Sequence, residues 1–363
     1  MSPKRFLAIL IIIILTVLGT LAAVTFYLDP LFHYRAPRAG YYYDLPEQNE
    51  RLQNDGILRH FDYDAVVIGT SMCQNFRTSE VDALFDTHSV KTCFSGGTIH
   101  EIAEALDTAF AARPDIGNVF RGIDYIQIMY DPYELNYDES QYPGYITNGP
   151  GIDDINYLLS KTVFFDYTVN MISNRIAGVP GGVESFDVYG NYTDDIVNGT
   201  GYGYDALVTL YGDISYKGPG EVRSLSEEEV QTVRESTALN ITRLANEHPD
   251  TQFYLFLTPY SIYYWKLSSE EGTIDKQIDA EKIMIEEILE CDNIHLYSFN
   301  DMEDLVCDLD NFSDKLHYSE KVNSLILKYM KEGTGLITKD NCASYIERER
   351  KLYNDYDYYG HFY

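Results

Sequence analysis

Basic residues are scarce in this sequence. Of its 363 residues, 27 are Lys or Arg whereas 57 are Asp or Glu, which gives a formal net charge of −30. Proteins that bind nucleic acid neutralise its phosphates with clustered Lys and Arg, so this composition argues against a nucleic-acid partner. An apolar content of 45% nevertheless indicates a folded protein rather than a disordered one.

The sequence also lacks the residue spacings that mark metal sites. None of its eight histidines stands in a His-Glu-x-x-His arrangement, and its five cysteines form no close-set pair such as Cys-x-x-Cys. We therefore expect no metal and no cofactor. Export would permit disulfides, and Cys291 with Cys307 is the most closely spaced pair in the C-terminal half, but the sequence does not fix a pairing.

Charge is absent from one long stretch near the N-terminus. The apolar residues 6–28 follow Lys4 and Arg5, and such a stretch is long enough to cross a hydrocarbon core of about 30 Å. Positive residues before it and acidic residues after it predict a single-pass anchor in the cell membrane, with a cytoplasmic N-terminus and an extracytoplasmic remainder. A cleaved signal peptide is the alternative, although the stretch is long for one.

Tyrosine, in contrast, is abundant, with 33 copies. Its flat apolar ring and polar hydroxyl suit grooves that contact sugars or other amphipathic ligands. The simpler interpretation is that most of these rings pack in the core or on the surface. The composition therefore permits a glycan partner without requiring one.

After the apolar stretch, short apolar runs alternate with helical patterns. This alternation predicts an α/β fold, a three-layer sandwich whose central parallel sheet has right-handed crossovers. We expect strands over residues 64–69, 90–94, 119–129, 251–257 and 293–297. We expect helices over residues 51–60, 79–85 (capped by Ser79), 100–112, 227–246 (opened by a Ser226–Glu229 capping box), 274–289 and 319–330.

The same patterns divide the chain into four segments. Residues 1–28 are the cytoplasmic stub and transmembrane anchor, and residues 29–61 are a stalk. Residues 62–332 form the α/β domain, interrupted by a long insertion over residues 131–222 that we expect to be helical between Ile155 and Ile176. Residues 333–363 are a Tyr-rich C-terminal tail.

Three side chains supply the chemistry of a serine hydrolase. Ser71 follows the first predicted strand at Gly69-Thr70-Ser71, and Asp314-Lys315-Leu316-His317 supplies a carboxylate and an imidazole near the C-terminus. A serine hydroxyl becomes a nucleophile when a base accepts its proton, here His317, and Asp314 would orient that imidazole. Ligands of parallel sheets bind beyond the carboxyl ends of the strands, where Ser71 is expected to lie.

Candidate oxyanion donors lie beside the predicted nucleophile. We expect Ser71 to begin a helix, whose first amides are unpaired and can bind a developing negative charge. Gly96 follows the second strand and lets a second backbone amide approach closely. Asn75 is a further candidate donor, although it is equally well explained as an ordinary helix residue.

These blocks resemble those of the SGNH, or GDSL-like, hydrolase superfamily. In that family the nucleophile follows the first strand, an oxyanion glycine follows the second, and an Asp-x-x-His motif lies near the C-terminus. The resemblance covers about residues 62–330 and implies an SGNH, flavodoxin-like fold. It is greatest to membrane-anchored members of Gram-positive bacteria, which include the wall D-alanyl transfer proteins and polysaccharide O-acetyltransferases.

One block departs from that family. Its members carry an Asn after the third strand, whereas this chain has Gly122-Ile123-Asp124 and then Tyr130-Asp131-Pro132. A carboxylate does not donate a hydrogen bond as an amide does. Loss of one oxyanion donor typically costs about 10²–10³ in rate, so the departure permits reduced activity or a different acyl acceptor.

The resemblance and the predicted location together imply an extracytoplasmic serine esterase or O-acyltransferase. Its substrates would be acyl esters, with acetyl as the expected group, on a cell-surface glycan or an acylated small molecule. Water or a sugar hydroxyl could accept the acyl group, and the sequence does not separate these. The alternative is an inactive protein of the same fold that binds glycan or a membrane acyltransferase.

Two other nucleophile or acid–base sets compete with this assignment. Cys73 lies two residues after Ser71 and could be a thiol nucleophile, but no separate base accompanies it, and a small packed thiol is the simpler interpretation. Asp131, Glu134 and Asp138 could pair as glycosidase carboxylates. In so acidic a chain they are better explained as solvated charges.

Overall fold

A computed structural model describes residues 1–45, 50–136, 142–192 and 201–363. The chain forms two compact units. Unit 1 comprises residues 1–62 and 137–185, and unit 2 comprises residues 63–136 and 186–363. The insertion expected over residues 131–222 is therefore shared, because its middle belongs to unit 1 and its two ends belong to unit 2.

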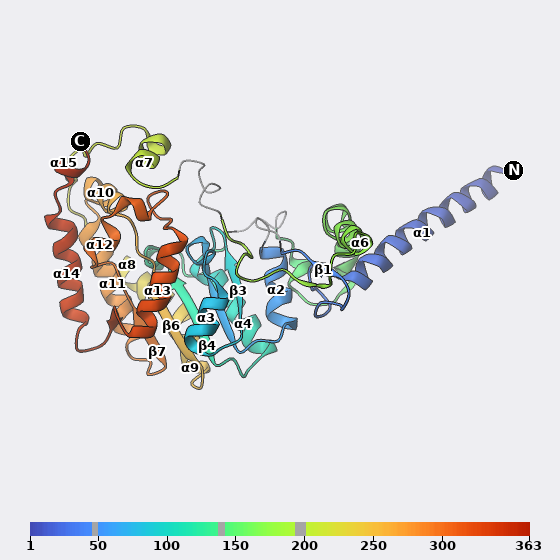
Figure 1. The fold of residues 1–363 in the computed structure, drawn as a ribbon, viewed down its shortest axis with the longest axis horizontal. Coiled ribbons are helices and arrows are strands. Elements are labelled where there is room, and N and C mark those ends of the chain that lie inside the picture. Colours follow the sequence, from blue (N-terminus) through green and yellow to red (C-terminus); the bar gives the residue numbers. More distant parts are fainter. Residues whose placement is uncertain (46–49, 137–141, 193–200) are drawn as a thin grey trace. The chain divides into compact units, whose positions relative to one another are not determined.

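Unit 2 is built on a six-stranded sheet with the order β3-β2-β4-β6-β7-β8 (Figure 1). The first five strands are parallel, and β8 is antiparallel to β7. This mostly parallel sheet confirms the predicted α/β fold class. The strands are β2 (Ala65–Thr70), β3 (Ser89–Phe94), β4 (Asn118–Ile123), β6 (Gln252–Leu257), β7 (Ile294–Tyr297) and β8 (Leu336–Ile337).

Helices cover both faces of this sheet, which explains why its central strands are almost continuously apolar. Every residue of β2 and β3 is buried. On one face α3 (Thr78–Phe85) packs against α13 (Glu320–Glu332). The helices of the second group, which pack against one another, are α4 (Ile99–Ala112), α8 (Glu227–Thr237), α9 (Arg243–Glu247), α11 (Ile274–Ile288) and α14 (Cys342–Asp355).

Two predicted elements need correction. The strand expected to reach residue 129 ends at Ile123, and a 3₁₀ helix, Tyr125–Met129, follows it. Ser79 does not cap α3, because the helix begins one residue earlier. A distant carboxylate takes over the capping: Asp187 Oδ1 accepts hydrogen bonds from the Ser79 amide at 2.9 Å and the Thr78 hydroxyl at 3.2 Å.

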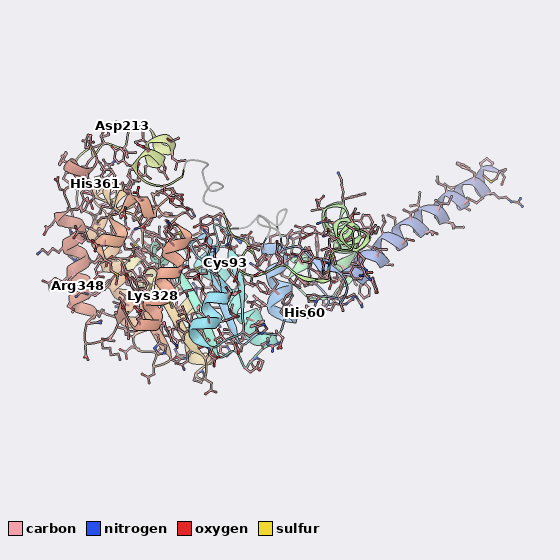
Figure 2. All side chains as sticks on the ribbon, in the orientation of Figure 1. His60, Cys93, Asp213, Lys328, Arg348 and His361 are labelled. Carbon is pink, nitrogen blue, oxygen red and sulfur yellow. The ribbon has the colours of Figure 1, made fainter. Side chains whose placement is uncertain are left out.

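The tyrosine-rich C-terminal segment folds into unit 2. It forms β8, α14 and the short helix α15 (Tyr358–His361). Tyr353 stacks on Trp265 with ring centroids 3.9 Å apart and donates a hydrogen bond to the Asn300 carbonyl. The tyrosines of α14 therefore serve packing, whereas Arg348 on the same helix (Figure 2) is exposed and forms an ion pair with Asp301 at 2.8 Å.

Two carboxyl groups are buried together where α14 meets α11. Glu281 and Glu349 are both fully buried, and Tyr345 donates to Glu281 Oε1 at 2.6 Å. Burial raises the pKa of Glu281 to about 7 and that of Glu349 well above its usual value. Both carboxyl groups therefore keep their protons to a higher pH than an exposed glutamate does.

This acid pair predicts a pH dependence of stability. Because the folded-state pKa values lie above the unfolded ones, the stability that this pair contributes is fully present below about pH 4.5 and is lost as the pH rises through about 7. In Glu349→Gln an amide replaces the second acid, so thermal unfolding should become less pH-dependent between pH 5 and 8, with Tm at pH 8 several degrees above wild type. An unchanged slope would contradict this assignment; Glu347→Gln, on the exposed face of α14, is the matched control.

Unit 1 contains the long apolar helix α1 (Pro3–Leu28), which is exposed along most of its length. It is the one helix among the described residues that is long and apolar enough to cross a membrane, a property shared by anchors and signal sequences. The predicted helix α2 (Arg51–His60) is confirmed. The unit also contains β1 (Tyr42–Tyr43), paired in parallel with β5 (Gly182–Val183), α5 (Ile155–Leu158) and α6 (Val169–Ile176).

Candidate active site

The order of the strands creates the position for the site. The chain passes from β2 to β3 on one side and then crosses to β4 on the other side of β2. At such a switch point the loops leaving the carboxyl ends of neighbouring strands separate and open a crevice. Ser71 directly follows β2, and Asp124 directly follows β4.

Three predicted side chains meet at this carboxyl edge of the sheet. The Ser71 hydroxyl lies 2.8 Å from His317 Nε2, and His317 Nδ1 lies 2.7 Å from Asp314 Oδ2. An ionised carboxylate can only accept, so His317 carries its proton on Nδ1 and leaves Nε2 free to accept from Ser71. This is the hydrogen-bond order of a nucleophile, a base and an orienting acid.

A tight loop holds Asp314 and His317 in register. Asp314 Oδ1 accepts hydrogen bonds from the backbone amides of Leu316 and His317, both at 2.7 Å, and the Ser313 amide donates to the His317 carbonyl at 2.9 Å. Burial opposes ionisation of Asp314, but these bonds and His317 outweigh it and lower the pKa of the carboxyl below its usual value. The acid is therefore a carboxylate at neutral pH.

Ser71 begins a 3₁₀ helix of three residues, Ser71–Cys73, rather than the longer helix expected from the sequence. Thr70 caps it by accepting from the Met72 amide at 3.3 Å. Two residues from α13 and its approach fix the same turn: the Tyr318 hydroxyl and the Asn323 amide both donate to the Met72 carbonyl. The nucleophile is thus held by contacts that the short turn could not supply alone.

Asp124 holds the turn that carries Ser71 in place, a role that the sequence did not reveal. Its carboxylate accepts hydrogen bonds from the hydroxyls of Thr70, Thr258 (2.8 Å) and Tyr260 (3.0 Å). It stands after β4, where the SGNH-like pattern has an Asn. This residue therefore positions the strand ends of β2 and β6 around Ser71 and acts as an acceptor, not as an oxyanion donor.

Asp124→Ala is expected to lower kcat by about 10², because a small misplacement of a nucleophile has an effect of that size, while KM changes little. Asp124→Asn keeps an oxygen acceptor and should retain activity within about tenfold of wild type. Steady-state kinetics on a small acyl ester measures both variants. If Asp124→Ala alters KM alone, or not at all, Asp124 does not position the nucleophile.

Gly96 lies at the end of the neighbouring strand, as predicted. The register pairs Thr70 with Phe94, so the turns after β2 and β3 leave the sheet side by side. Gly96 has φ +61°, a left-handed conformation that favours glycine, and its carbonyl accepts from Asn136 Nδ2 at 2.7 Å. Gly96 is exposed in the turn after β3, and a role for its amide as an oxyanion donor stays a prediction.

Asn75, the third candidate donor, is buried and lies in a turn rather than in a helix. Its Oδ1 accepts from the Tyr192 amide at 3.0 Å, which ties a distant segment to the nucleophile turn. Its Nδ2 is buried with no hydrogen-bond partner among the described residues. A role for Asn75 as an oxyanion donor stays a prediction.

Lys91 and Tyr192 border the site and were not singled out from the sequence. Lys91 is fully buried in β3, and its ammonium donates to the carbonyls of Gln74 and Phe76 and to Asn191 Oδ1. Tyr192 packs edge-on against His317, with ring centroids 5.6 Å apart. The only sequence signal that could have pointed to either residue was the position of Lys91, a charged residue inside a predicted apolar strand.

Cys73 does not have the surroundings of a nucleophile. Its thiol is fully buried, and burial raises its pKa well above the usual value. A Cβ added to Gly69 or Gly122 would lie 2.4 Å from Cys73 Sγ, so both glycines make room for this thiol between β2 and β4. Cys73 is therefore a packing residue, and all five cysteines are free.

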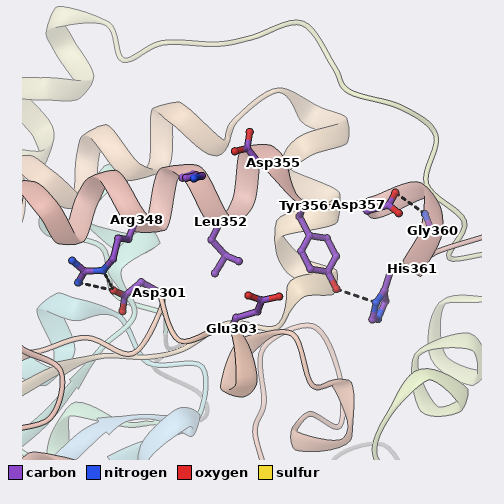
Figure 3. A pocket seen from close by; sticks show the side chains of 10 residues that line it. Asp301, Glu303, Arg348, Leu352, Asp355, Tyr356, Asp357, Gly360 and His361 are labelled. Atoms are coloured by element: carbon purple, nitrogen blue, oxygen red, sulfur yellow. Dashed lines mark hydrogen bonds and ion pairs between the residues drawn. The ribbon is translucent and has the colours of Figure 1, made fainter.

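The other candidate acids do not assemble into a second centre. Asp131 and Glu134 are exposed, and Asp138 lies outside the described residues. Among the residues that the structure describes, no group of three or more His, Cys, Asp or Glu could hold a metal. A hollow of about 720 Å³ lies against α14 and α15, but Ser71, Asp314 and His317 do not line it (Figure 3).

Comparisons with known proteins add little to this geometry. No family model matches the sequence, and no curated protein matches it. A solved structure from Streptococcus pneumonia, described as "a putative platelet activating factor", is similar over 79% of this chain and 92% of its own, with 11% identity and a TM-score of 0.38. So distant a likeness carries no argument about activity.

Proposed function

We propose that this chain is a membrane-anchored, extracytoplasmic serine esterase or O-acyltransferase of SGNH-like type. One observation supports the proposal most strongly: Ser71, His317 and Asp314, far apart in the sequence, form a continuous hydrogen-bonded series at the switch point of a parallel sheet. The motif spacing that resembles SGNH hydrolases singles out the same three residues.

In the proposed mechanism, Ser71 Oγ attacks the carbonyl carbon of an acyl ester while His317 Nε2 accepts the hydroxyl proton. Asp314 stabilises the imidazolium that forms, and the amides of Ser71 and Gly96 would bind the oxyanion. His317 then gives the proton to the departing alcohol oxygen, which leaves an acyl group on Ser71. Water or a sugar hydroxyl, deprotonated by His317, releases the acyl group and restores the serine.

The proposed substrate is a small acyl ester, with acetyl preferred, on a cell-surface glycan or an acylated small molecule. The long apolar helix α1 supports a position at the outer face of the membrane. Tyr192 beside His317 places an aromatic ring at the site, the kind of group that suits a sugar. Hydrolysis and transfer use the same acyl-enzyme and differ only in the acceptor.

A second candidate is an inactive protein of the same fold that binds glycan or a membrane acyltransferase. Asp124 favours it, because an acceptor stands where SGNH-like enzymes have an amide donor. The first candidate is better supported, since an unused serine would not need a hydrogen-bonded imidazole and a correctly oriented acid.

Hydrolysis of 4-nitrophenyl acetate and 4-nitrophenyl octanoate by the purified full chain tests the two candidates. The enzyme should release nitrophenol from the acetate faster than from the octanoate, and Ser71→Ala should abolish both, whereas Ser344→Ala, an exposed serine on α14, should not. Stimulation by added glycan would indicate transfer. A folded wild-type chain no faster than Ser71→Ala would favour the inactive protein.

A further inference from the structure

Two arginines are fixed around the last turn of α1. The Arg35 guanidinium lies 4.3 Å from the Phe26 ring centroid and donates to the Phe26 carbonyl at 2.7 Å. Arg38 makes the same two contacts with the next residue of the helix. Its guanidinium lies 4.4 Å from the Tyr27 ring centroid and donates to the Tyr27 carbonyl. The two cations therefore stand at the end of the apolar helix, where a membrane would change from hydrocarbon to headgroups.

Most of the hydrogen-bonding capacity of these arginines is unused. A guanidinium has five N–H donors, and each of these two donates one bond to the protein within the described residues. Neither forms an ion pair there, because Asp29, the nearby acid, is buried and accepts from the amides of Tyr34 and Arg35 and from the Tyr157 hydroxyl. The remaining donors suit an anion.

An apolar groove of about 550 Å³ runs beside the same end of α1. Thr16, Gly19, Thr20 and Ala23 form its helix side, and Tyr41 and Ile172 form the opposite side. The Thr16 and Thr20 hydroxyls donate back to carbonyls of α1 at 2.8 Å, so the groove needs no polar partner. Its width comes from small side chains, and a Cβ on Gly19 would meet no atom within 4 Å.

We propose that unit 1 binds one anionic phospholipid of the outer leaflet at this place. The lipid phosphate would lie between the guanidiniums of Arg35 and Arg38, and one acyl chain would fill the groove beside α1. The inference rests on the proposed membrane anchor, since a cleaved α1 would remove half of the groove.

The distribution of charge favours an anionic lipid over other occupants. Unit 2 holds 45 of the 57 acidic residues but 19 of the 27 basic ones, so most of the net negative charge belongs to it. Such a protein is repelled by an anionic membrane surface. Fixed arginines at the foot of the anchor would offset that repulsion locally, and the adjoining apolar groove matches a lipid chain rather than a soluble anion.

The test uses the full-length chain in nanodiscs of phosphatidylcholine with a minor fraction of phosphatidylglycerol, followed by native mass spectrometry of the released protein. Wild type should retain phosphatidylglycerol preferentially. Arg35→Gln/Arg38→Gln should lower this retention about thirtyfold, because each of the two arginines near an anionic surface contributes on the order of 1 kcal/mol. Gly19→Leu, which fills the groove, should lower it without changing the charge.

Controls separate this inference from its rivals. Arg223→Gln/Lys321→Gln removes two exposed charges of unit 2 and should leave lipid retention unchanged. Retention that survives the arginine variant, or a lipid displaced by inorganic phosphate alone, would overturn the proposal. Labelling of Ser71 by a fluorophosphonate, measured on the same samples, reports the proposed function separately, so either idea can fail without the other.

Discussion

Replacing His317 by Gln should lower the rate of acyl-enzyme formation by about 10⁴ or more, which is the scale seen when the base of a serine hydrolase is removed. The reason is local. Ser71 has its hydroxyl 2.8 Å from His317 Nε2, and among the described residues no other base is hydrogen-bonded to it. Glutamine can accept a hydrogen bond but cannot take the proton, so Ser71 would remain a neutral alcohol.

The rate is best measured as pre-steady-state release of nitrophenol from a small acyl ester. His361→Gln is the matched control, because that imidazole bonds to the Tyr356 hydroxyl at 2.9 Å in the hollow of Figure 3. The His361→Gln variant should react at nearly the wild-type rate. If His317→Gln stays within tenfold of wild type while folding normally, the assignment of the base is wrong.

The second large effect is expected from Asp314→Asn, which should reduce kcat by about 10⁴. An amide in this place can donate to His317 Nδ1 and so favour the tautomer whose Nε2 carries the proton. That tautomer cannot accept from Ser71. The backbone bonds from Leu316 and His317 need only an oxygen acceptor, which Asn retains, so the loop should keep its shape.

The stability of Asp314→Asn gives an independent check with a defined sign. The pKa of Asp314 is lowered in the folded protein from its usual 3.8, so its carboxylate contributes stability that is present above about pH 4 and is lost as the pH falls below it. The Tm difference between wild type and variant should shrink only in that acidic range. Asp310→Asn, an exposed acid nearby, should change neither kcat nor this profile.

Local sequence patterns predicted those parts of the fold that depend on neighbouring residues. The apolar run before Ser71, the Ser226 capping box and the Asp-x-x-His spacing each encode their own geometry, and the structure contains all three. Helix α10 (Ile262–Glu271) was not expected, because its aromatic and β-branched start is typical of strands. Ser261, whose hydroxyl accepts from the Tyr264 amide, caps the N-terminus of that helix.

The unpredicted parts of the site depend on contacts between distant residues. Asp124 acquires its role only when Thr70, Thr258 and Tyr260 bring their hydroxyls to it from two other strand ends. Tyr192 reaches His317 because Asn75 holds its amide. No residue spacing in the sequence predicts these contacts. An Asp after a strand is common, so the role of Asp124 can be recognised only in the folded protein.

Mapping of a fluorophosphonate adduct by peptide mass spectrometry tests the central claim most directly. The full-length wild-type chain should carry the phosphonyl group on Ser71, and the adduct should fall at least a hundredfold in His317→Gln, since attack on phosphorus needs the same proton acceptor. A folded wild-type chain that carries no adduct on Ser71, or that labels equally well without His317, would contradict the account.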